Sequence, residues 1–319
     1  MARRPRTRTV TIASFMAALA LLAALGAMAE ARAARHDAER WPAPGRRVDI
    51  GGRRLHIRCD GDGGPVVVLD AGLGQSSLDW SLVQPALAAH GRVCSYDRAG
   101  MGWSDPAPAP GSAERTVADL RTLLAAAGEP PPYVLVGHSA GVNTVRLFAA
   151  RFPDAVHGLV LVEPPLIAAV PPAAVAGLVA VRRGVDGLRR VGALRWLGPL
   201  GLLRLLYGGA SPPPAVAARA PFLYRPAAIR ATRDEIRALP ETIRQVRAAA
   251  TPGAWRDWPV VVVTAAGPEP SPRLAAGLAA LAALSSRGRV VYADSSHFVP
   301  YDRPAVVIEA VRAVVEADR

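Results

Sequence analysis

The amino-acid sequence predicts an α/β protein, with an eight-stranded, mostly parallel sheet, helices on both faces and an inserted helical lid. Short valine-rich apolar runs recur along the chain, as in strands that are buried on both faces. Segments with apolar residues three and four positions apart separate most of these runs, which is the spacing of amphipathic helices. One interval, residues 164–258, is too long for a single crossover and contains proline-rich breaks. This interval predicts the lid.

Residues 1–33 are predicted to be a signal peptide or an N-terminal membrane anchor. Arginines at positions 3, 4, 6 and 8 precede an uncharged apolar run over residues 10–29. A signal peptide has an apolar core of about 7 to 15 residues, whereas a membrane span needs about 20. Ala27 and Ala29 form a candidate cleavage site, so both interpretations remain open. Retention would associate the protein with a membrane through residues 10–29. In either case we expect the rest of the chain to be exported, to the cell envelope or as a secreted protein.

The core is expected to begin at Arg46, after a polar, proline-containing linker over residues 34–45. Alternating runs flank Gly51 and Gly52, a dipeptide suited to a tight hairpin turn. The sequence therefore predicts an opening hairpin. The eight strands are expected at residues 47–50, 54–59, 66–69, 92–96, 133–136, 158–162, 260–264 and 289–292.

Helices are expected between most of these strands, at residues 116–127, 140–152, 272–284 and 304–317. Alternating strands and helices give a parallel sheet joined by right-handed crossovers. The lid at 164–258 then divides the core into residues 46–163 and 259–319. Within it, the strongly apolar stretch 194–207 favours packing inside the lid over contact with a membrane.

Composition argues against several classes of partner. The formal net charge of +12 comes entirely from arginine, since the sequence contains no lysine, and the arginines are scattered rather than interleaved with aromatic residues. This distribution argues against a nucleic-acid groove. The glycine turn at residues 71–74 lacks the third glycine of a dinucleotide fingerprint, and the two cysteines match no metal-binding pattern. We therefore expect neither a cofactor nor a metal.

The segment Gly-His-Ser-Ala-Gly at residues 137–141 predicts a nucleophilic serine. It directly follows an expected strand and opens an expected helix, which is the context of a nucleophile elbow. Glycines suit so tight a turn, and the helix N-terminus favours negative charge that develops nearby. Ser139 is therefore the candidate nucleophile.

His297 is the candidate general base, because a serine hydroxyl needs a neighbouring base to take its proton. Of the six histidines, His297 alone lies in a loop shortly after the last expected strand. The other five lie in the linker, on the first hairpin, at a helix end, at the wrong edge of the sheet and inside the elbow itself.

Two carboxylates compete to orient this histidine. Glu163 ends the expected strand 158–162, at the carboxyl edge where open α/β sheets hold their sites. A charge at the end of an apolar strand is costly unless it is paired, which favours Glu163. Glu269 follows the strand 260–264 and is the alternative acid. For the oxyanion we expect the backbone N–H groups of Ala140 and Leu73.

Three motifs resemble the α/β-hydrolase superfamily, and the similarity spans nearly all of residues 46–318. They are GHSAG at 137–141, SYDRAGMGWSDP at 95–106 and SSHFVPYDRP at 295–304. The resemblance implies that the second and fourth strands are neighbours, which would bring Cys59 near Cys94 and favour a disulfide. It also implies a helical cap between strands six and seven. The chain departs from the family in having Ala71-Gly72 where His-Gly is frequent, and in lacking the usual Asp after strand seven.

The expected activity is hydrolysis of a small, apolar carboxylic ester through an acyl-enzyme, as in serine esterases and lipases. Haloalkane dehalogenases resemble this pattern in placing the acid after strand six, which supports Glu163. Those enzymes and epoxide hydrolases carry Asp in the elbow, so Ser139 argues against both chemistries. An amidase, a peptidase or a cofactor-free haloperoxidase would use the same triad. A non-catalytic, envelope-anchored binding protein with this fold is the alternative from another class.

Overall fold

An eight-stranded sheet forms the centre of the protein in the computed structural model, which describes residues 6–108, 111–167, 169–197, 211–251, 253–266 and 270–317. The strands are β1 (Arg46–Asp49), β2 (Arg54–Asp60), β3 (Val66–Asp70), β4 (Val93–Tyr96), β5 (Tyr133–His138), β6 (Val156–Val162), β7 (Pro259–Ala265) and β8 (Arg287–Ala293). Their spatial order is β1-β2-β4-β3-β5-β6-β7-β8. The β1–β2 and β2–β4 pairs are antiparallel and the others are parallel. The predicted fold class is confirmed.

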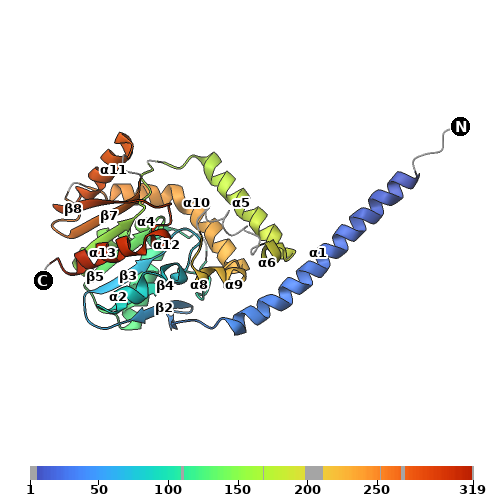
Figure 1. Cartoon of the computed structure of the whole chain (residues 1–319), viewed down its shortest axis with the longest axis horizontal. Helices are drawn as coiled ribbons and strands as arrows, with labels where there is room; N and C mark the ends of the chain where they lie inside the picture. The colour runs from blue at the N-terminus through green and yellow to red at the C-terminus, as the bar shows by residue number, and fades with distance from the viewer. Residues whose placement is uncertain are drawn as a thin grey trace.

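Helices cover both faces of the sheet because each central strand is apolar on both sides. Along β5, Tyr133 and Leu135 face one apolar cluster, whereas Val134 and Val136 face the other. The first face carries α3 (Ala113–Ala127), α4 (Gly141–Arg151) and α11 (Pro272–Ala282), and the second carries α2 (Gln84–Ala88) and α13 (Pro304–Val315). Figure 1 shows α2 and α13 lying together over the second face. The site residues that follow the strands are thus held on a rigid core.

The described residues between β6 and β7 are largely helical. They form α5 (Pro172–Arg190), α6 (Ala193–Leu197), α8 (Pro214–Ala217), α9 (Ala220–Leu223) and α10 (Pro226–Ala248). Helix α10 packs against α5, and also against α3 and α4 of the core. Most of the apolar stretch predicted at 194–207 lies outside the described residues. That this helical insert acts as a lid stays a prediction.

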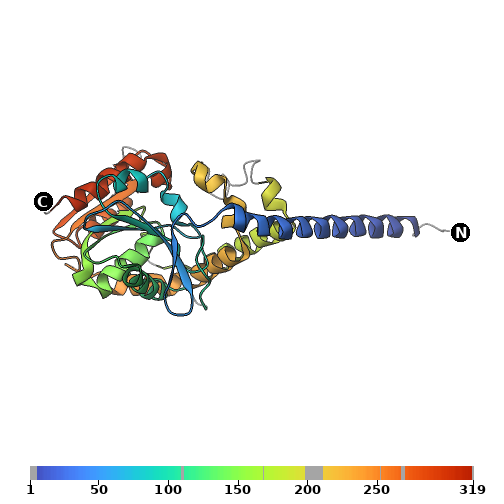
Figure 2. The same cartoon turned by 90° about the horizontal axis from the view of Figure 1, so that it is seen from below.

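Helix α1 (Arg6–Arg40) extends well away from the sheet, and both views show only its C-terminal part near the domain (Figures 1 and 2). It contacts α5 and α9 of the helical insert. Arg195 binds Glu30 at 2.9 Å and Asp37 at 2.6 Å. Residues 34–40, expected to belong to a linker, are therefore helical. Alanine and arginine favour helix in this segment, and the two ion pairs anchor it.

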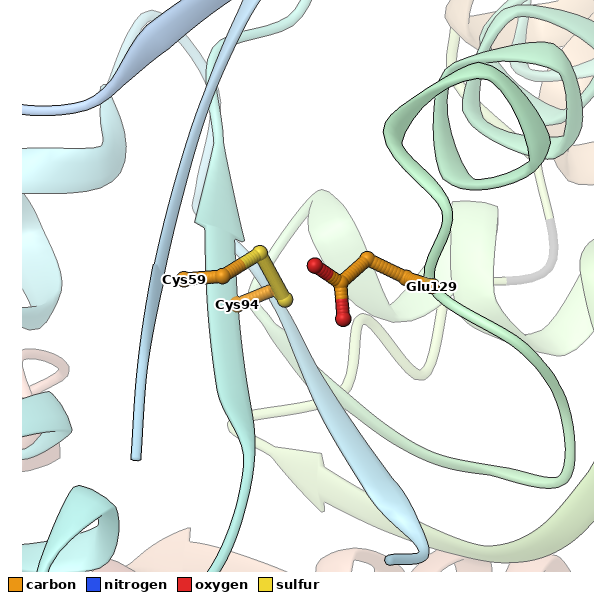
Figure 3. Close-up of side chains that lie close together, drawn as sticks. All are labelled: Cys59, Cys94 and Glu129. Atoms are coloured by element: carbon orange, nitrogen blue, oxygen red, sulfur yellow. A yellow bond between two sulfur atoms is a disulfide. The ribbon is translucent and has the colours of Figure 1, made fainter. Parts of the chain in front are cut away.

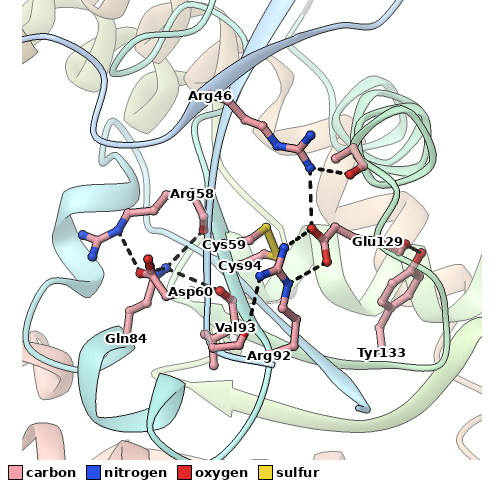
Figure 4. The surroundings of a disulfide bond; sticks show 12 residues. Arg46, Arg58, Cys59, Asp60, Gln84, Arg92, Val93, Cys94, Glu129 and Tyr133 are labelled. Carbon is pink, nitrogen blue, oxygen red and sulfur yellow. Dashed lines mark hydrogen bonds and ion pairs between the residues drawn. A yellow bond between two sulfur atoms is a disulfide. The ribbon is translucent and has the colours of Figure 1, made fainter. Parts of the chain in front are cut away.

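Cys59 and Cys94 form the disulfide that the family resemblance implied. They are direct partners in the antiparallel β2–β4 pairing (Figure 4). The carboxylate of Glu129 lies against the two sulfurs (Figure 3), but Arg92 holds it through two hydrogen bonds of 2.6 and 3.0 Å. Disulfide sulfurs are not thiolate ligands, so this group is an ion pair beside a covalent bond rather than a metal site.

Removal of this disulfide is expected to destabilise the domain. It joins residues separated by 35 positions, and a loop of that length predicts a loss of about 3 to 4 kcal/mol in the free energy of unfolding. Urea unfolding of the double variant Cys59→Ala, Cys94→Ala measures this loss. The parent protein with a reductant serves as the control and should approach the variant. Equal urea midpoints for all three samples would contradict the prediction.

Candidate active site

Ser139 occupies the sharp turn between β5 and α4. Its φ of 52° lies in the left-handed region, which is strained for a serine. A Cβ atom on Gly137 would lie 2.7 Å from the backbone of Gly141, and one on Gly141 would lie 2.4 Å from the carbonyl oxygen of Asp70. Both glycines are therefore required by close packing. The turn raises the hydroxyl of Ser139 above the carboxyl ends of the strands.

His297 meets Ser139 from the loop between β8 and α12 (Val299–Asp302). Its Nε2 lies 3.0 Å from Ser139 Oγ, although 158 residues separate the two in the chain. The imidazole is about half exposed, which leaves room for a reacting molecule beside it. The structure thus brings together the candidate nucleophile and the candidate base.

Glu163 completes the hydrogen-bonded chain. Its Oε2 lies 2.9 Å from His297 Nδ1, and its Oε1 accepts hydrogen bonds from Thr264 Oγ1 and Ala265 N at 2.9 and 2.5 Å. Burial raises the pKa of Glu163, but the hydrogen bonds from His297, Ala265 and Thr264 outweigh it and hold the pKa below its usual value. The carboxylate is therefore ionised at neutral pH. The alternative acid, Glu269, lies outside the described residues.

Two backbone N–H groups near the serine are available for an oxyanion. The N–H of Gly72 is occupied, since it donates to Gln75 Oε1 at 2.6 Å. Within the part of the chain that the structure describes, the N–H groups of Leu73 and Ala140 have no hydrogen-bond partner. Ala140 directly precedes α4, so the positive end of that helix also faces this position. These are the two donors expected from the sequence.

A buried arginine that the sequence interpretation did not assign supports the turn carrying Leu73. Arg98 donates to Asp70 Oδ1, to the carbonyl of Ala71 and to the carbonyl of Gly72, each at 2.6 Å. Its Nε also donates to Glu235 on α10 at 2.7 Å. Arg98 therefore orients the carbonyls of the turn and joins the turn to the helical insert. In the sequence, the one feature that could have indicated Arg98 is its position in the 95–106 motif, shortly after a buried strand.

A cavity of about 230 Å³ opens at Ser139. The elbow, the oxyanion turn, the His297 loop and the helical insert all contribute to its wall. The lining residues are Gly72, Leu73, Gly74, Gln75, His138, Ser139, Arg182, Tyr224, His297 and Phe298. The insert supplies Arg182 and Tyr224, so it bounds the space in which a substrate would lie.

The fold and the site together define a hydrolase of the α/β class. Residues 64–304 match the family model described as the alpha/beta hydrolase fold, and the chain belongs to this family. The uncharacterized protein YqjL of Bacillus subtilis is 36% identical over 106 residues, which are 33% of this chain and 42% of YqjL. The chain thus matches less than half the length of the curated relatives.

Solved structures share the whole fold at lower identity. The epoxide hydrolase CorEH superposes with a TM-score of 0.65 at 20% identity, over 86% of this chain and 99% of that one. The enol-lactonase of Burkholderia xenovorans superposes with a TM-score of 0.63 at 23% identity, over 84% of this chain and 99% of that one. These likenesses extend the shared architecture beyond the segments that match in sequence.

His138, beside the nucleophile, is buried, and each of its two ring nitrogens faces an oxygen atom. Its Nδ1 lies 3.1 Å from Gln75 Oε1, and its Nε2 lies 3.0 Å from the carbonyl oxygen of His297. Burial lowers the pKa of His138 to about 4, so the ring is neutral at pH 7. A neutral imidazole carries a single N–H and so donates to one of these two oxygens at a time. The ring thus contacts the loop that carries His297 without adding charge.

Burial of neutral His138 predicts a loss of stability in acid. The unfolded chain binds this proton below a pH near 6.5, whereas the folded protein binds it only near pH 4. The free energy of unfolding should therefore fall by about 3 kcal/mol between these pH values. Urea unfolding from pH 7 to 4 should show a steeper decline for the parent than for His138→Gln. Parallel declines would contradict the prediction, because all other groups titrate in both proteins.

Proposed function

We propose that the protein hydrolyses a carboxylic ester through a covalent acyl-enzyme on Ser139. The observation that carries this proposal is the continuous hydrogen-bonded chain from Ser139 Oγ through His297 to Glu163. A serine, a histidine and a carboxylate in this order form the arrangement that activates a hydroxyl for attack on a carbonyl. An elbow serine, rather than an aspartate, favours acyl transfer over the opening of epoxides.

In the first half-reaction, Ser139 Oγ attacks the carbonyl carbon while His297 Nε2 takes the hydroxyl proton. The ionised Glu163 stabilises the imidazolium that forms. The N–H groups of Leu73 and Ala140 bind the negative oxygen of the tetrahedral intermediate. The intermediate then collapses, and His297 returns the proton to the departing alcohol.

In the second half-reaction, a water molecule attacks the acyl group on Ser139. His297 Nε2 takes a proton from this water and then returns it to Ser139 Oγ as the acid departs. Arg98 does not touch the reacting atoms in this scheme. It is a positioning residue, because it holds the carbonyls of Ala71 and Gly72 and so aims the N–H of Leu73.

Substitutions of Ser139 and Glu163 should both lower the activity, and the loss should be larger for Ser139. Ser139→Ala is expected to abolish labelling by a fluorophosphonate and to lower kcat for a short-chain ester by roughly 10⁶-fold. Glu163→Gln should lower kcat by about 10⁴-fold, because the neutral amide no longer stabilises the imidazolium. Mass spectrometry of the labelled peptide and steady-state kinetics measure these effects.

Glu269→Gln is the matched control for the acid and should retain nearly the parent kcat. A large loss in Glu269→Gln together with full activity in Glu163→Gln would reverse the assignment of the acid. A parent protein that is folded by circular dichroism, yet neither reacts with fluorophosphonate nor hydrolyses esters, would overturn the proposed function.

We further propose that α1 is retained as a membrane anchor and that the domain is exported. The helix contains a candidate span, Ala13–Asp37, in which an 18-residue window has a mean hydropathy of 1.8. Its large apolar side chains are exposed, and they are Phe15, Met16, Leu19, Leu21, Leu22, Leu25 and Met28. The helix also packs on the insert, because Gly26 lies against Val191 and Glu30 binds Arg195. Retention would place those apolar side chains in lipid.

Full-length protein expressed with its own N-terminus should remain in the membrane fraction after alkaline carbonate extraction. Its intact mass should include residues 1–29, because a retained anchor is not cleaved. The exposed apolar side chains of α1 are stable only in lipid, which keeps the protein in the membrane. A soluble product that begins at or near Glu30 would show instead that the segment is cleaved.

A further inference from the structure

We infer that Arg182 forms an anion-binding subsite, so that the ester substrate carries a carboxylate on its acyl chain. This inference rests on the proposed ester hydrolysis and narrows its substrate class. Arg182 belongs to α5 of the helical insert and lines the cavity that also contains Ser139 and His297. It is thus a charged side chain from the insert in the space beside the nucleophile.

The charged end of Arg182, rather than its aliphatic stem, reaches the oxyanion turn. Its Nη2 lies 3.5 Å from the position that a Cβ atom on Gly74 would occupy. Gly74 directly follows Leu73, whose N–H is the proposed oxyanion donor. A group that contacts this guanidinium would therefore lie only a short distance from the carbonyl under attack.

Arg182 is half-buried, yet within the described ranges it has no hydrogen bond or ion pair with another residue. Its neighbours on the same helix differ, because Arg189 and Arg190 both bind Asp186. Arg98 and Arg195, which are also shielded from solvent, each bind two carboxylates. Other partly buried arginines, such as Arg146 and Arg225, also have no carboxylate partner among the described residues, but they do not line the cavity at Ser139 as Arg182 does.

The acidic side chains around the cavity are already committed. Glu163 accepts from His297, Thr264 and Ala265. Glu235 binds Arg98. Because the nearby carboxylates are engaged, the positive charge of Arg182 is left for a ligand. A guanidinium binds a carboxylate through two parallel N–H groups, and this pairing gains strength where water is partly excluded.

The position and the charge together select half-esters of short dicarboxylic acids. In such a molecule a few methylene groups separate the free carboxylate from the ester carbonyl, which suits a guanidinium that lies beside Gly74, the residue after the proposed oxyanion donor. The small apolar ester expected from the sequence is thereby narrowed to one with a charged end on its acyl chain.

The decisive experiment compares the hydrolysis of three ethyl esters of nearly equal length. The rate for each ester is measured by titrating the acid that is released. The esters are monoethyl succinate, which is anionic, ethyl butyrate, which is neutral, and ethyl 4-aminobutanoate, which is cationic. The full-length parent should favour monoethyl succinate over ethyl butyrate in kcat/KM by about 10-fold or more, and should disfavour the cationic ester.

Arg182→Gln should lower kcat/KM for monoethyl succinate by about 10- to 100-fold and leave that for ethyl butyrate within about threefold. The matched control is Arg183→Gln, which removes the same charge from an exposed neighbour on α5 and should alter neither ester. An equal loss on both esters in Arg182→Gln, or no preference for the anionic ester in the parent, would overturn the inference.

Protection against fluorophosphonate separates this inference from the proposed function. Succinate should slow the labelling of Ser139 in the parent but not in Arg182→Gln, whereas butyramide should slow both equally. Labelling that succinate does not affect overturns the anion subsite and leaves the serine hydrolase intact. Stronger protection by inorganic phosphate than by succinate would overturn the carboxylate assignment. Absence of labelling in a folded parent contradicts the proposed function itself.

Discussion

The close packing of the elbow on the oxyanion turn constrains the rest of the site. Gly141 lies so near the carbonyls of Asp70 and Ala71 that no side chain fits between the two turns. The same stretch is bound by Arg98, which donates to the carbonyls of Ala71 and Gly72. Two neighbouring parallel strands, β3 and β5, thus deliver their following turns to one place. The N–H groups proposed to bind the oxyanion sit on these two turns, so their separation is set by the sheet rather than by a flexible loop.

Glu163 shows how an unfavourable position is stabilised by its partners. It follows a strand that is buried along most of its length, and its φ of 53° is strained for a residue with a side chain. Burial alone would favour the protonated acid, but three hydrogen bonds to its two carboxylate oxygens favour the ionised form. They are donated by His297, Thr264 and Ala265. Strain at both Ser139 and Glu163 is consistent with a site whose geometry is maintained by the surrounding fold.

The helical insert connects the site to the N-terminal helix. Glu235 on α10 binds Arg98 beneath the oxyanion turn, and Arg195 near the other end of the insert binds Glu30 and Asp37 of α1. The proposed anchor and the proposed catalytic turn are therefore attached to the same group of helices. Helix α5, which carries Arg182, is also contacted by α1.

The sequence by itself determined the eight strands, the hairpin, the elbow and the position of His297, because each depends on local periodicity or on a motif with its own turn chemistry. It also placed Glu163 at the end of a strand, although it left Glu269 open. Only the tertiary structure decided which carboxylate reaches His297, how Arg98 is used, that Arg182 enters the cavity and that residues 34–40 continue a helix. Those features join residues far apart in the chain, such as Arg98 with Glu235 and Arg195 with Asp37. The pattern of residues along one segment cannot predict such partners, because they come into contact only after the sheet and the insert have packed together.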